Sequence, residues 1–555
     1  MLKLRAEDAN IRRALGDLYN ARFKMVLAIA FLGLIGLAWY NRFIQDDAFI
    51  SLRYSYNLAH GNGLVWNPGQ RLEGYTNFLW TMIMAAGLRL GAEPILLSYI
   101  LGLICYAATL ILTYRLARLI LGSRGLGLLA VIVVGANYTF SSYATGGLET
   151  QLQAALFTGS CYLLLRSMTS GKWEIRTMLG LSLVLSAAML TRMDSALLAI
   201  VVFTVGGYYV SRERGPVSRK LAKSGALVLP FMVIVGGWLI WKLHYYGNIL
   251  PNTYYAKVTS PTSAIRGLWF VYSFLTEYWL AAFPILAIAT IGRKLSARAI
   301  VLLTIVVLWL AYIVKIGGDF MEYRVMVPIF PLMALVFVGM IARITQRREY
   351  QAALISVILI GSLLHGIRSE VYRMRYESPL NVFDVETIPQ LQGHLTNPNE
   401  DWCEVGKSLG EYFDYSPEVK IGVYPAGAVP YYSRLPALDM RGLNDAWIAR
   451  HGNVVGTAAG HQLKSPLSYV IGQKVNLIIG QPAMVPVGDP LDHCMRVIDP
   501  NFFWGVKDYT ELPPGSKAIA IPISNEYYLA VICIRTNEMI ENAIFTNGWD
   551  CLPLN

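Results

Sequence analysis

Two adjacent carboxylates stand at the start of a long polar segment. Asp46 and Asp47 follow the apolar run 25–40 within a few residues. Neighbouring carboxylates repel each other, and charge is costly at a membrane boundary, so the pair needs a metal ion, a cationic side chain or a hydroxyl as a partner. A carboxylate beside a hydroxyl can act as its general base. The alternative is structural, with Asp47 capping a helix predicted over 48–59.

Cationic side chains that could bind a phosphate occur in three further polar segments. TRMD contains Arg192, HYYGNILPNTYYAK contains Lys257, and GGDFMEYR contains Arg324. A guanidinium can contact a phosphate through two N–H groups, and a cation stabilises the charge on a departing anion. The alternatives are that Arg192 snorkels along the bilayer and that the charges around Arg324 only pair with one another.

Four more polar residues are candidates for substrate contact, namely Glu73, Glu149, Asn252 and Asp319. Glu149 follows two glycines in TGGLET, which permit close approach of the backbone, although an acidic residue there also suits the first turn of a helix. The cofactor requirement stays open. If a divalent metal ion takes part, Asp46 and Asp47 are its predicted ligands.

The elements that must position these residues are apolar runs long enough to cross a bilayer. Of the 555 residues, 55% are hydrophobic and 15% charged, whereas a soluble chain carries about a quarter charged residues. The runs lie before residue 367. We predict about eleven membrane helices, near 25–40, 95–113, 126–140, 150–165, 177–190, 195–210, 225–243, 268–290, 299–314, 325–342 and 352–367.

Lys and Arg gather in alternate loops between these runs, which predicts the orientation of the chain. By the positive-inside rule, residues 1–24 are cytoplasmic and residues 368–555 form a domain outside the membrane. The membrane domain is 25–367, with a first outside loop over 41–94, and the candidate residues all fall in its outside loops. Because the net charge of +11 resides largely in inside loops, no nucleic-acid partner is expected.

The C-terminal part reads as an α/β domain. VKIGVY, KVNLIIG, KAIAIPI and YYLAVICIR predict strands, and DWCEVGKSLGEYF predicts a helix. YPAGAVPYY has a glycine-rich turn but lacks the GxGxxG pattern and a P-loop lysine, which argues against nucleotide binding. An acceptor platform and a structural cap both remain open roles for this domain. Its four cysteines, Cys403, Cys494, Cys533 and Cys551, would suffice for two disulfides.

The string DDAFISLRYSYNLAHGNGLVWNPGQRLEGYTNFLW resembles the first outside loop of the GT-C superfamily of integral-membrane glycosyltransferases. Within that superfamily it is similar to cell-wall arabinofuranosyltransferases that use decaprenyl-phosphoryl-arabinose and add terminal β-1,2-linked arabinofuranose. TGGLET, TRMD and PAGAVPYYSRLPALDMRGLND are similar as well. The resemblance is most specific over residues 45–80.

This resemblance implies an inverting glycosyltransferase in the plasma (inner) membrane. It would move a sugar, with arabinofuranose as the best guess, from a polyprenyl-phosphate donor to an extracytoplasmic glycan or glycoconjugate acceptor. The acidic pair of such enzymes is catalytic, which carries over to Asp46 and Asp47. The alternative is a polytopic transporter or flippase of lipid-linked sugars. Transporters usually carry ionisable residues or helix breaks inside their spans, whereas here the polar residues lie in loops.

Overall fold

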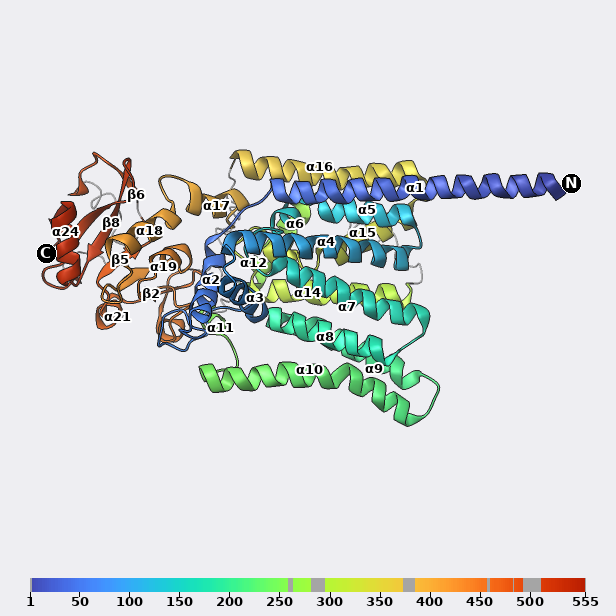
Figure 1. Ribbon diagram of the computed structural model, residues 1–555, viewed down its shortest axis with the longest axis horizontal. Helices are drawn as coiled ribbons and strands as arrows, with labels where there is room; N and C mark the ends of the chain where they lie inside the picture. Colours follow the sequence, from blue (N-terminus) through green and yellow to red (C-terminus); the bar gives the residue numbers. More distant parts are fainter. Residues whose placement is uncertain are drawn as a thin grey trace.

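The computed structural model describes residues 2–257, 263–280, 295–372, 385–456, 460–482, 484–492 and 511–554. Figure 1 shows two parts, a bundle of roughly parallel helices and a smaller domain that contains a sheet at one end of the bundle. The first helix, α1 (Leu2–Tyr40), projects beyond the opposite end. The predicted division into a helical part and a C-terminal α/β domain is therefore confirmed.

A helix is present at each predicted span, as far as the described residues reach. These helices are α1, α4 (Pro94–Leu121), α5 (Arg124–Gly135), α7 (Thr150–Ser170), α8 (Ile175–Thr191), α9 (Ala196–Arg212), α10 (Val217–Tyr246), α12 (Ser263–Glu277), α14 (Ala297–Ile316), α15 (Phe330–Ile344) and α16 (Arg348–Tyr372). The predicted span 268–290 lies outside the described residues beyond position 280.

Not all of these helices are long enough to cross a membrane alone. By length and composition, 6 segments qualify among the residues described: Asn20–Tyr40, Pro94–Leu121, Met193–Arg212, Val217–Tyr246, Ala297–Ile316 and Arg348–Ser369. Helix α5 has 12 residues, which at 1.5 Å per residue is about 18 Å, shorter than a hydrocarbon core of about 30 Å. The membrane helices are confirmed as a class, and the count of eleven crossings stays a prediction.

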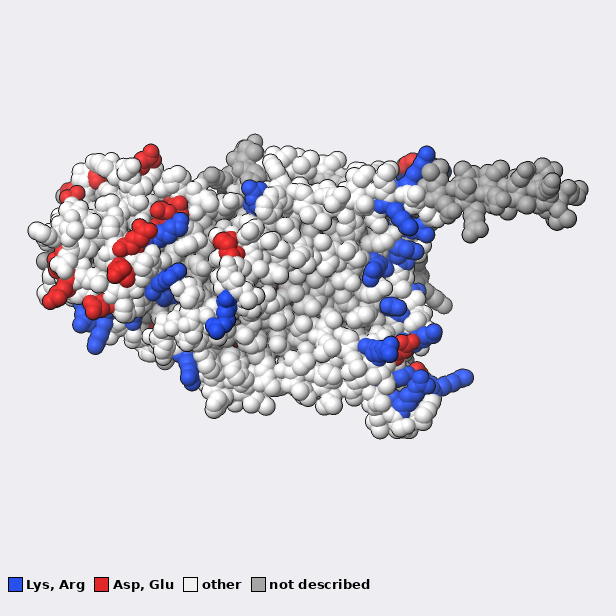
Figure 2. All heavy atoms as spheres, in the orientation of Figure 1, with Lys and Arg blue, Asp and Glu red and all other residues white. Residues whose placement is uncertain are grey.

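The surface charge follows the predicted loop pattern. Figure 2 shows Lys and Arg concentrated at the end of the bundle away from the sheet domain, next to a broad middle band with almost no charged side chains. An uncharged band flanked by a basic end is the arrangement expected for a bundle in a bilayer with that end in the cytoplasm. The orientation itself stays a prediction.

Three short helices lie between the bundle and the sheet domain: α2 (Asp46–Ala59), α3 (Phe78–Arg89) and α11 (Asn252–Ala256). The spacing of Phe49, Leu52 and Tyr56 predicts α2 as a helix on the membrane surface. The helix is present, but its predicted surroundings are wrong, because the C-terminal domain covers it. Phe49 is fully buried and packs against the rings of Tyr431 and Tyr432 at 5.4 Å in each case.

The C-terminal sheet is mixed. Strands β2 (Ala437–Asp439), β1 (Ile421–Val423) and β5 (Leu477–Gly480) are parallel, and β8 (Tyr527–Cys533), β7 (Lys517–Pro522) and β9 (Cys551–Pro553) continue the sheet in antiparallel pairing in that order. Strand β6 (Met484–Pro486) also pairs with β8. The four predicted strands correspond to β1, β5, β7 and β8, and the predicted helix is α18 (Trp402–Tyr412).

The remaining short elements connect these parts. They are α6 (Tyr138–Ser142), η1 (Met193–Ser195), η2 (Arg324–Met326), α17 (Ile388–Thr396), α19 (Ala428–Ser433), α20 (Ile448–His451), β3 (Asn453–Val454), β4 (Leu463–Lys464), α21 (Leu467–Gly472) and α24 (Glu538–Asn547). Two disulfides in this domain are not realised, since Cys403, Cys533 and Cys551 are free thiols. Cys494 lies outside the described residues.

Candidate active site

Two adjoining cavities lie where the bundle meets the C-terminal domain. The first, with an open volume of about 680 Å³, is lined by the start of α2 and by residues of the C-terminal domain, and we call it the domain cavity. The second, of about 700 Å³, is lined mainly by the loops at this end of the bundle, and we call it the loop cavity. The residues that line both are Asp47, Ile50, Phe320, Leu443, Gly460 and His461.

Asp46 binds the C-terminal domain. Its two carboxylate oxygens accept the backbone N–H groups of Gly427, at 3.0 Å, and Ala428, at 2.7 Å, where α19 begins. Position 427 has to be glycine, because an added Cβ would lie 1.9 Å from the carbonyl oxygen of Asp46. Burial raises the pKa of Asp46 to about 7, and the two N–H donors act against that increase.

Arg53 binds the other end of α19. Its guanidinium donates to the carbonyl oxygens of Pro430 and of Leu435, the latter at 2.8 Å, and its Nε donates to that of Trp66 at 2.7 Å. Helix α2 therefore bonds both ends of α19, with an acid at the N–H end and a cation at the carbonyl end. Side chains of these charges match the exposed backbone groups at the two ends of a helix.

Asp47 has a different environment. It lines both cavities, and its carboxylate forms no hydrogen bond or ion pair within the part of the chain that the structure describes. Burial raises the pKa of Asp47 above the ordinary value of 3.8, while the positive charges of Arg324 and Lys257 act in the opposite direction. A carboxylate with no structural bond and a raised pKa is suited to accept a proton.

The three cations predicted to bind phosphate meet in the loop cavity, as do Asp47 and Glu149. Arg192 pairs with Glu149 at 2.9 Å and with Asp194 at 2.9 Å. Arg324 donates from two nitrogens to one oxygen of Asp319, both at 2.8 Å. These pairs hold both guanidinium groups in place, and the pair of Arg324 with Asp319 is the mutual pairing that the alternative interpretation expected for that loop.

Lys257 differs from the two arginines. It follows α11, its side chain is exposed, and its ammonium group forms no ion pair or hydrogen bond with the residues that the structure describes. Burial lowers the pKa of His461 to about 4, so this ring is neutral at pH 7. The charged residues that line the loop cavity are then Arg192, Lys257, Arg324, Asp47 and Glu149. Cations are in excess, which favours an anionic ligand.

Three of the predicted substrate residues do not line either cavity. Glu73 is buried and pairs with Lys242 of α10 at 2.7 Å. The side-chain amide of Asn252 donates to backbone carbonyls, including that of Gly442 at 2.9 Å, and so joins α11 to the C-terminal domain. Asp319 pairs with Arg324, which does line the loop cavity. Of the four, only Glu149 lines a cavity.

The sequence reasoning missed the part of the domain cavity that the C-terminal domain provides, including Trp402, Tyr424 and Arg441. Trp402 and Tyr424 are more than nine-tenths buried. Within the described residues, the Trp402 indole N–H, the Tyr424 hydroxyl and the Arg441 Nε have no hydrogen-bond partner. Arg441 stands in the segment that resembles the family and Tyr424 directly precedes it, but no local signal gave either residue a role.

The residues do not fit a divalent metal ion. No group of three His, Cys, Asp or Glu side chains arranged for a metal occurs among the residues that the structure describes. Both oxygens of Asp46 accept backbone N–H groups, and the charges that act most strongly on Asp47 are the cations Arg324 and Lys257, ahead of the acids Asp319 and Glu386. A hard cation requires oxygen ligands and is repelled by such surroundings. We therefore assign no step to a metal.

Comparison with known proteins agrees with the geometry. Residues 78–241 match the family described as dolichyl-phosphate-mannose-protein mannosyltransferase, and residues 389–521 match a domain family of unknown function. The structure resembles that of ArnT from Cupriavidus metallidurans bound to undecaprenyl phosphate, with a TM-score of 0.58 and 12% identity over 94% of this chain and 98% of ArnT. The chain has a GT-C fold. The apo form of ArnT gives a TM-score of 0.52.

Two curated relatives confirm the resemblance seen in the sequence. Both are named terminal beta-(1->2)-arabinofuranosyltransferase. The protein from Mycobacterium tuberculosis is 28% identical over 345 residues, which cover 54% of this chain and 52% of the relative. The protein from Corynebacterium glutamicum is 28% identical over 344 residues, covering 54% and 47%. The alignments thus span about half the length of each relative.

Proposed function

We propose that this GT-C protein is an inverting glycosyltransferase. It takes a sugar, with arabinofuranose as the best candidate, from a polyprenyl-phosphate donor and transfers it to a glycan or glycoconjugate acceptor outside the membrane. The observation that carries the proposal is the position of Asp47, which lies between a cation-rich cavity and a cavity lined by the C-terminal domain. The names of the relatives support the sugar, and they do not support the transporter alternative.

The loop cavity is the proposed site of the donor phosphate. Arg192 and Arg324 are fixed by their carboxylate partners, so they provide charge at set positions. The Lys257 ammonium group has no partner among the described residues and can pair directly with the phosphate. Fixed charges need no reorganisation during the reaction, which is the main source of their catalytic effect. The structural relative ArnT was solved with undecaprenyl phosphate, a ligand of the proposed class.

The domain cavity is the proposed site of the acceptor. Its charged lining includes the acids Asp46, Asp47 and Glu386 and the cations His394 and Arg441. It lacks the excess of cations found in the loop cavity, and so suits a neutral ligand better than a phosphate. Sugar hydroxyls both donate and accept hydrogen bonds. The Trp402 indole N–H, the Tyr424 hydroxyl and the Arg441 Nε–H, which lack partners among the described residues, are donors that an acceptor glycan can satisfy.

The two cavities define the sides of the anomeric carbon on which the acceptor attacks and the phosphate departs. An acceptor hydroxyl in the domain cavity attacks the anomeric carbon of the donor, and Asp47 takes the hydroxyl proton as the new C–O bond forms. The bond between the anomeric carbon and the phosphate oxygen breaks, and its electron pair leaves with the polyprenyl phosphate. The cations of the loop cavity stabilise this anion. Attack and departure on opposite faces invert the anomeric centre.

The proposed function is tested with purified protein in lipid nanodiscs and a panel of radiolabelled donors. We expect the protein to consume a polyprenyl-phosphoryl pentose and to release polyprenyl phosphate when an arabinan acceptor is present. A nucleotide sugar should not be consumed. If a nucleotide sugar is used at an equal rate, or if no polyprenyl-phosphate sugar is consumed, the proposal is wrong. Consumption of a hexose donor alone would correct the sugar and leave the enzyme class intact.

A further inference from the structure

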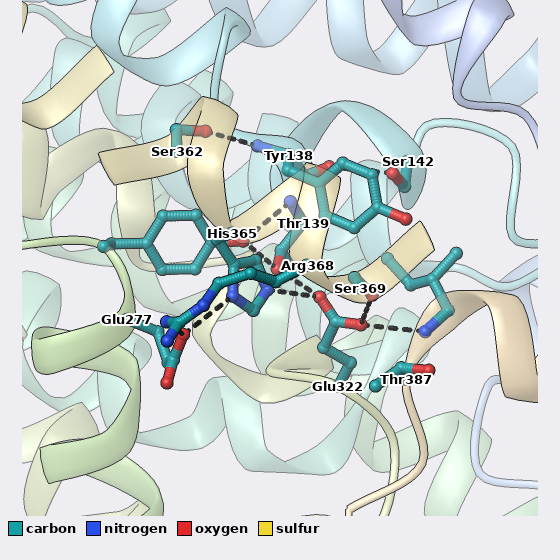
Figure 3. Close-up of polar contacts among 12 residues, drawn as sticks. Tyr138, Thr139, Ser142, Glu277, Glu322, Ser362, His365, Arg368, Ser369 and Thr387 are labelled. Carbon is teal, nitrogen blue, oxygen red and sulfur yellow. Dashed lines mark hydrogen bonds and ion pairs between the residues drawn. The ribbon is translucent and has the colours of Figure 1, made fainter. Parts of the chain in front are cut away.

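A fully buried carboxylate lies two residues before Arg324. Glu322 stands in the loop between α14 and η2 and has no exposed side-chain surface. One of its oxygens bonds His365 Nε2 at 2.7 Å. The other accepts the Ser369 hydroxyl at 3.1 Å and the backbone N–H of Ile388 at 2.8 Å. Figure 3 shows these contacts converging on the Glu322 carboxylate.

His365 extends this network to another helix. Its Nδ1 faces Glu277 at the end of α12 at 3.4 Å, and Arg368 donates to the same Glu277 oxygen at 3.1 Å. Figure 3 shows the imidazole of His365 between the carboxyl groups of Glu277 and Glu322. The network therefore ties the loop that carries Arg324 to α12 and to the end of α16.

Backbone hydrogen bonds attach the same loop to the C-terminal domain. The Glu322 N–H donates to the Glu386 carbonyl at 3.0 Å, and the Glu386 N–H donates to the Phe320 carbonyl at 2.7 Å. These bonds form a short parallel bridge between Met321 and Glu386. Together with the bond from Ile388, they fix the backbone on one side of Arg324.

The residue between Glu322 and Arg324 has a strained backbone. Tyr323 adopts φ 44°, a left-handed conformation that costs energy for a residue with a side chain. Such a conformation persists only where the surroundings hold it. The Tyr323 ring is fully buried, with Phe270 at 5.3 Å and His365 at 5.9 Å between ring centres. The turn at Tyr323 brings Arg324 back to Asp319, where its guanidinium is held.

We propose that Glu322 and His365 are positioning residues that set the place of Arg324 in the loop cavity. Apolar residues of similar size often replace a buried charged pair without loss of stability, so stability alone is a weak explanation for such a pair. What the pair adds is a fixed backbone geometry, because its directional hydrogen bonds hold the loop that contains the strained turn at Tyr323. The inference rests on the proposed role of Arg324 in binding the donor phosphate.

The test is a double-mutant cycle on decaprenyl phosphate, the product of the proposed reaction. Its Kd is measured by isothermal titration with the full chain in nanodiscs, so the readout does not require turnover. We expect Glu322→Gln and Arg324→Ala each to weaken binding roughly tenfold, which is about 1.4 kcal/mol. The double variant should bind no more weakly than Arg324→Ala alone, because Glu322 acts through Arg324.

Glu73→Gln is the matched control, because it removes charge from a buried carboxylate of an ion pair that lines neither cavity. Its Kd should equal that of the unchanged protein. Should Glu322→Gln fail to fold, Ser369→Ala removes one bond to the same carboxylate, and the cycle is run with it, with a smaller expected loss. Additive effects in the double variant would overturn the inference but leave the phosphate site in place. An unchanged Kd in Arg324→Ala would overturn both.

Discussion

Asp46 and Asp47 are neighbours in the chain, yet their carboxylates have different partners. Asp46 accepts two backbone N–H groups of the C-terminal domain, and Asp47 lines both cavities without a structural bond among the described residues. The two proposed roles, docking of the C-terminal domain for Asp46 and general base for Asp47, therefore fall to two residues of identical type. This division gives the two positions different expected phenotypes.

We predict that Asp47→Asn lowers turnover by at least about a hundredfold, because a general base contributes about 10² to 10⁴ in rate. Thermal stability should be unchanged, since Asp47 makes no bond that stabilises the fold. Turnover is measured as release of polyprenyl phosphate, and stability is measured by thermal unfolding of the purified protein. Near-normal turnover in Asp47→Asn would remove this residue from the mechanism.

We predict the reverse pattern for Asp46→Asn. The amide retains one oxygen acceptor, so one of the two bonds to Gly427 and Ala428 is lost, at a cost of about 0.5 to 1.5 kcal/mol. The C-terminal domain should become more sensitive to protease, while turnover of the intact protein falls by less than in Asp47→Asn. A catalytic loss in Asp46→Asn that equals the loss in Asp47→Asn, with unchanged protease resistance, contradicts the division of roles.

The pH dependence follows from the environment of Asp47. The base must be deprotonated, so activity is lost as the pH falls through its pKa, and burial places that pKa above the ordinary 3.8. Lys257 favours the charged carboxylate and thereby lowers this pKa. Lys257→Gln should consequently move the acid limb of the kcat/KM profile to higher pH, and Lys257→Arg should move it less. If the acid limb does not move in Lys257→Gln, the charge of Lys257 does not influence the pKa of the catalytic base.

At the scale of elements, the contact between α2 and α19 is one of those that join the bundle to the C-terminal domain. We predict that Gly427→Ala disrupts this contact, because the new Cβ would lie 1.9 Å from the Asp46 carbonyl oxygen. Forcing an extra carbon into a packed site costs about 1 to 3 kcal/mol. Protease resistance of the C-terminal domain and turnover should fall together.

The control is Gly472→Ala at the end of α21 in the same domain, where an added Cβ has no atom within 4 Å. This variant should behave like the unchanged protein in both assays. If Gly427→Ala also keeps full protease resistance and turnover, the α2–α19 contact does not position the site.

The positions of the helices and strands were largely predictable from the sequence, but the elements that pack against each of them were not. Long apolar runs and the four buried strands carry their own periodic or continuous pattern, which is why helices and strands appear where the sequence predicts them. The surroundings of α2 were predicted wrongly, because its apolar face suits a membrane surface and a covering domain equally well. Only the fold shows that Tyr431 and Tyr432 cover Phe49.

The same distinction applies to the site. The chemistry of Asp47, Arg192, Lys257 and Arg324 was visible in residue type and loop position, and the structure brings all four to one cavity. Their proposed roles stay predictions. Nothing in the local string separates Asp46 from Asp47, because the partner of Asp46 lies 381 residues away in the chain. Glu73 and Asn252 were predicted as site residues for the same reason. Their partners, Lys242 and Gly442, lie far away in the chain, so the local sequence does not show that both side chains are already paired.

At the scale of the whole molecule, the predicted orientation is testable by labelling. We expect a Ser218→Cys variant in a cysteine-free background to resist a membrane-impermeant thiol reagent in intact cells. Position 218 lies in the first turn of α10, which begins at the end of the bundle away from the sheet domain (Figure 1), the end predicted to be cytoplasmic. Ser524→Cys, at an exposed position of the C-terminal domain, should be labelled. Labelling at position 218 and protection at position 524 would invert the predicted topology.

The 381-residue separation between Asp46 and Gly427 also has a consequence for biosynthesis. A ribosome adds about 5 to 20 residues per second, so the segment whose N–H groups bind Asp46 is made roughly 20 to 80 s after Asp46 itself. During that interval Asp46 and Asp47 are present in the nascent chain, but the C-terminal domain that lines the domain cavity is not. The contact between α2 and α19, and with it the domain cavity, can therefore form only after residues 427 and 428 have been made.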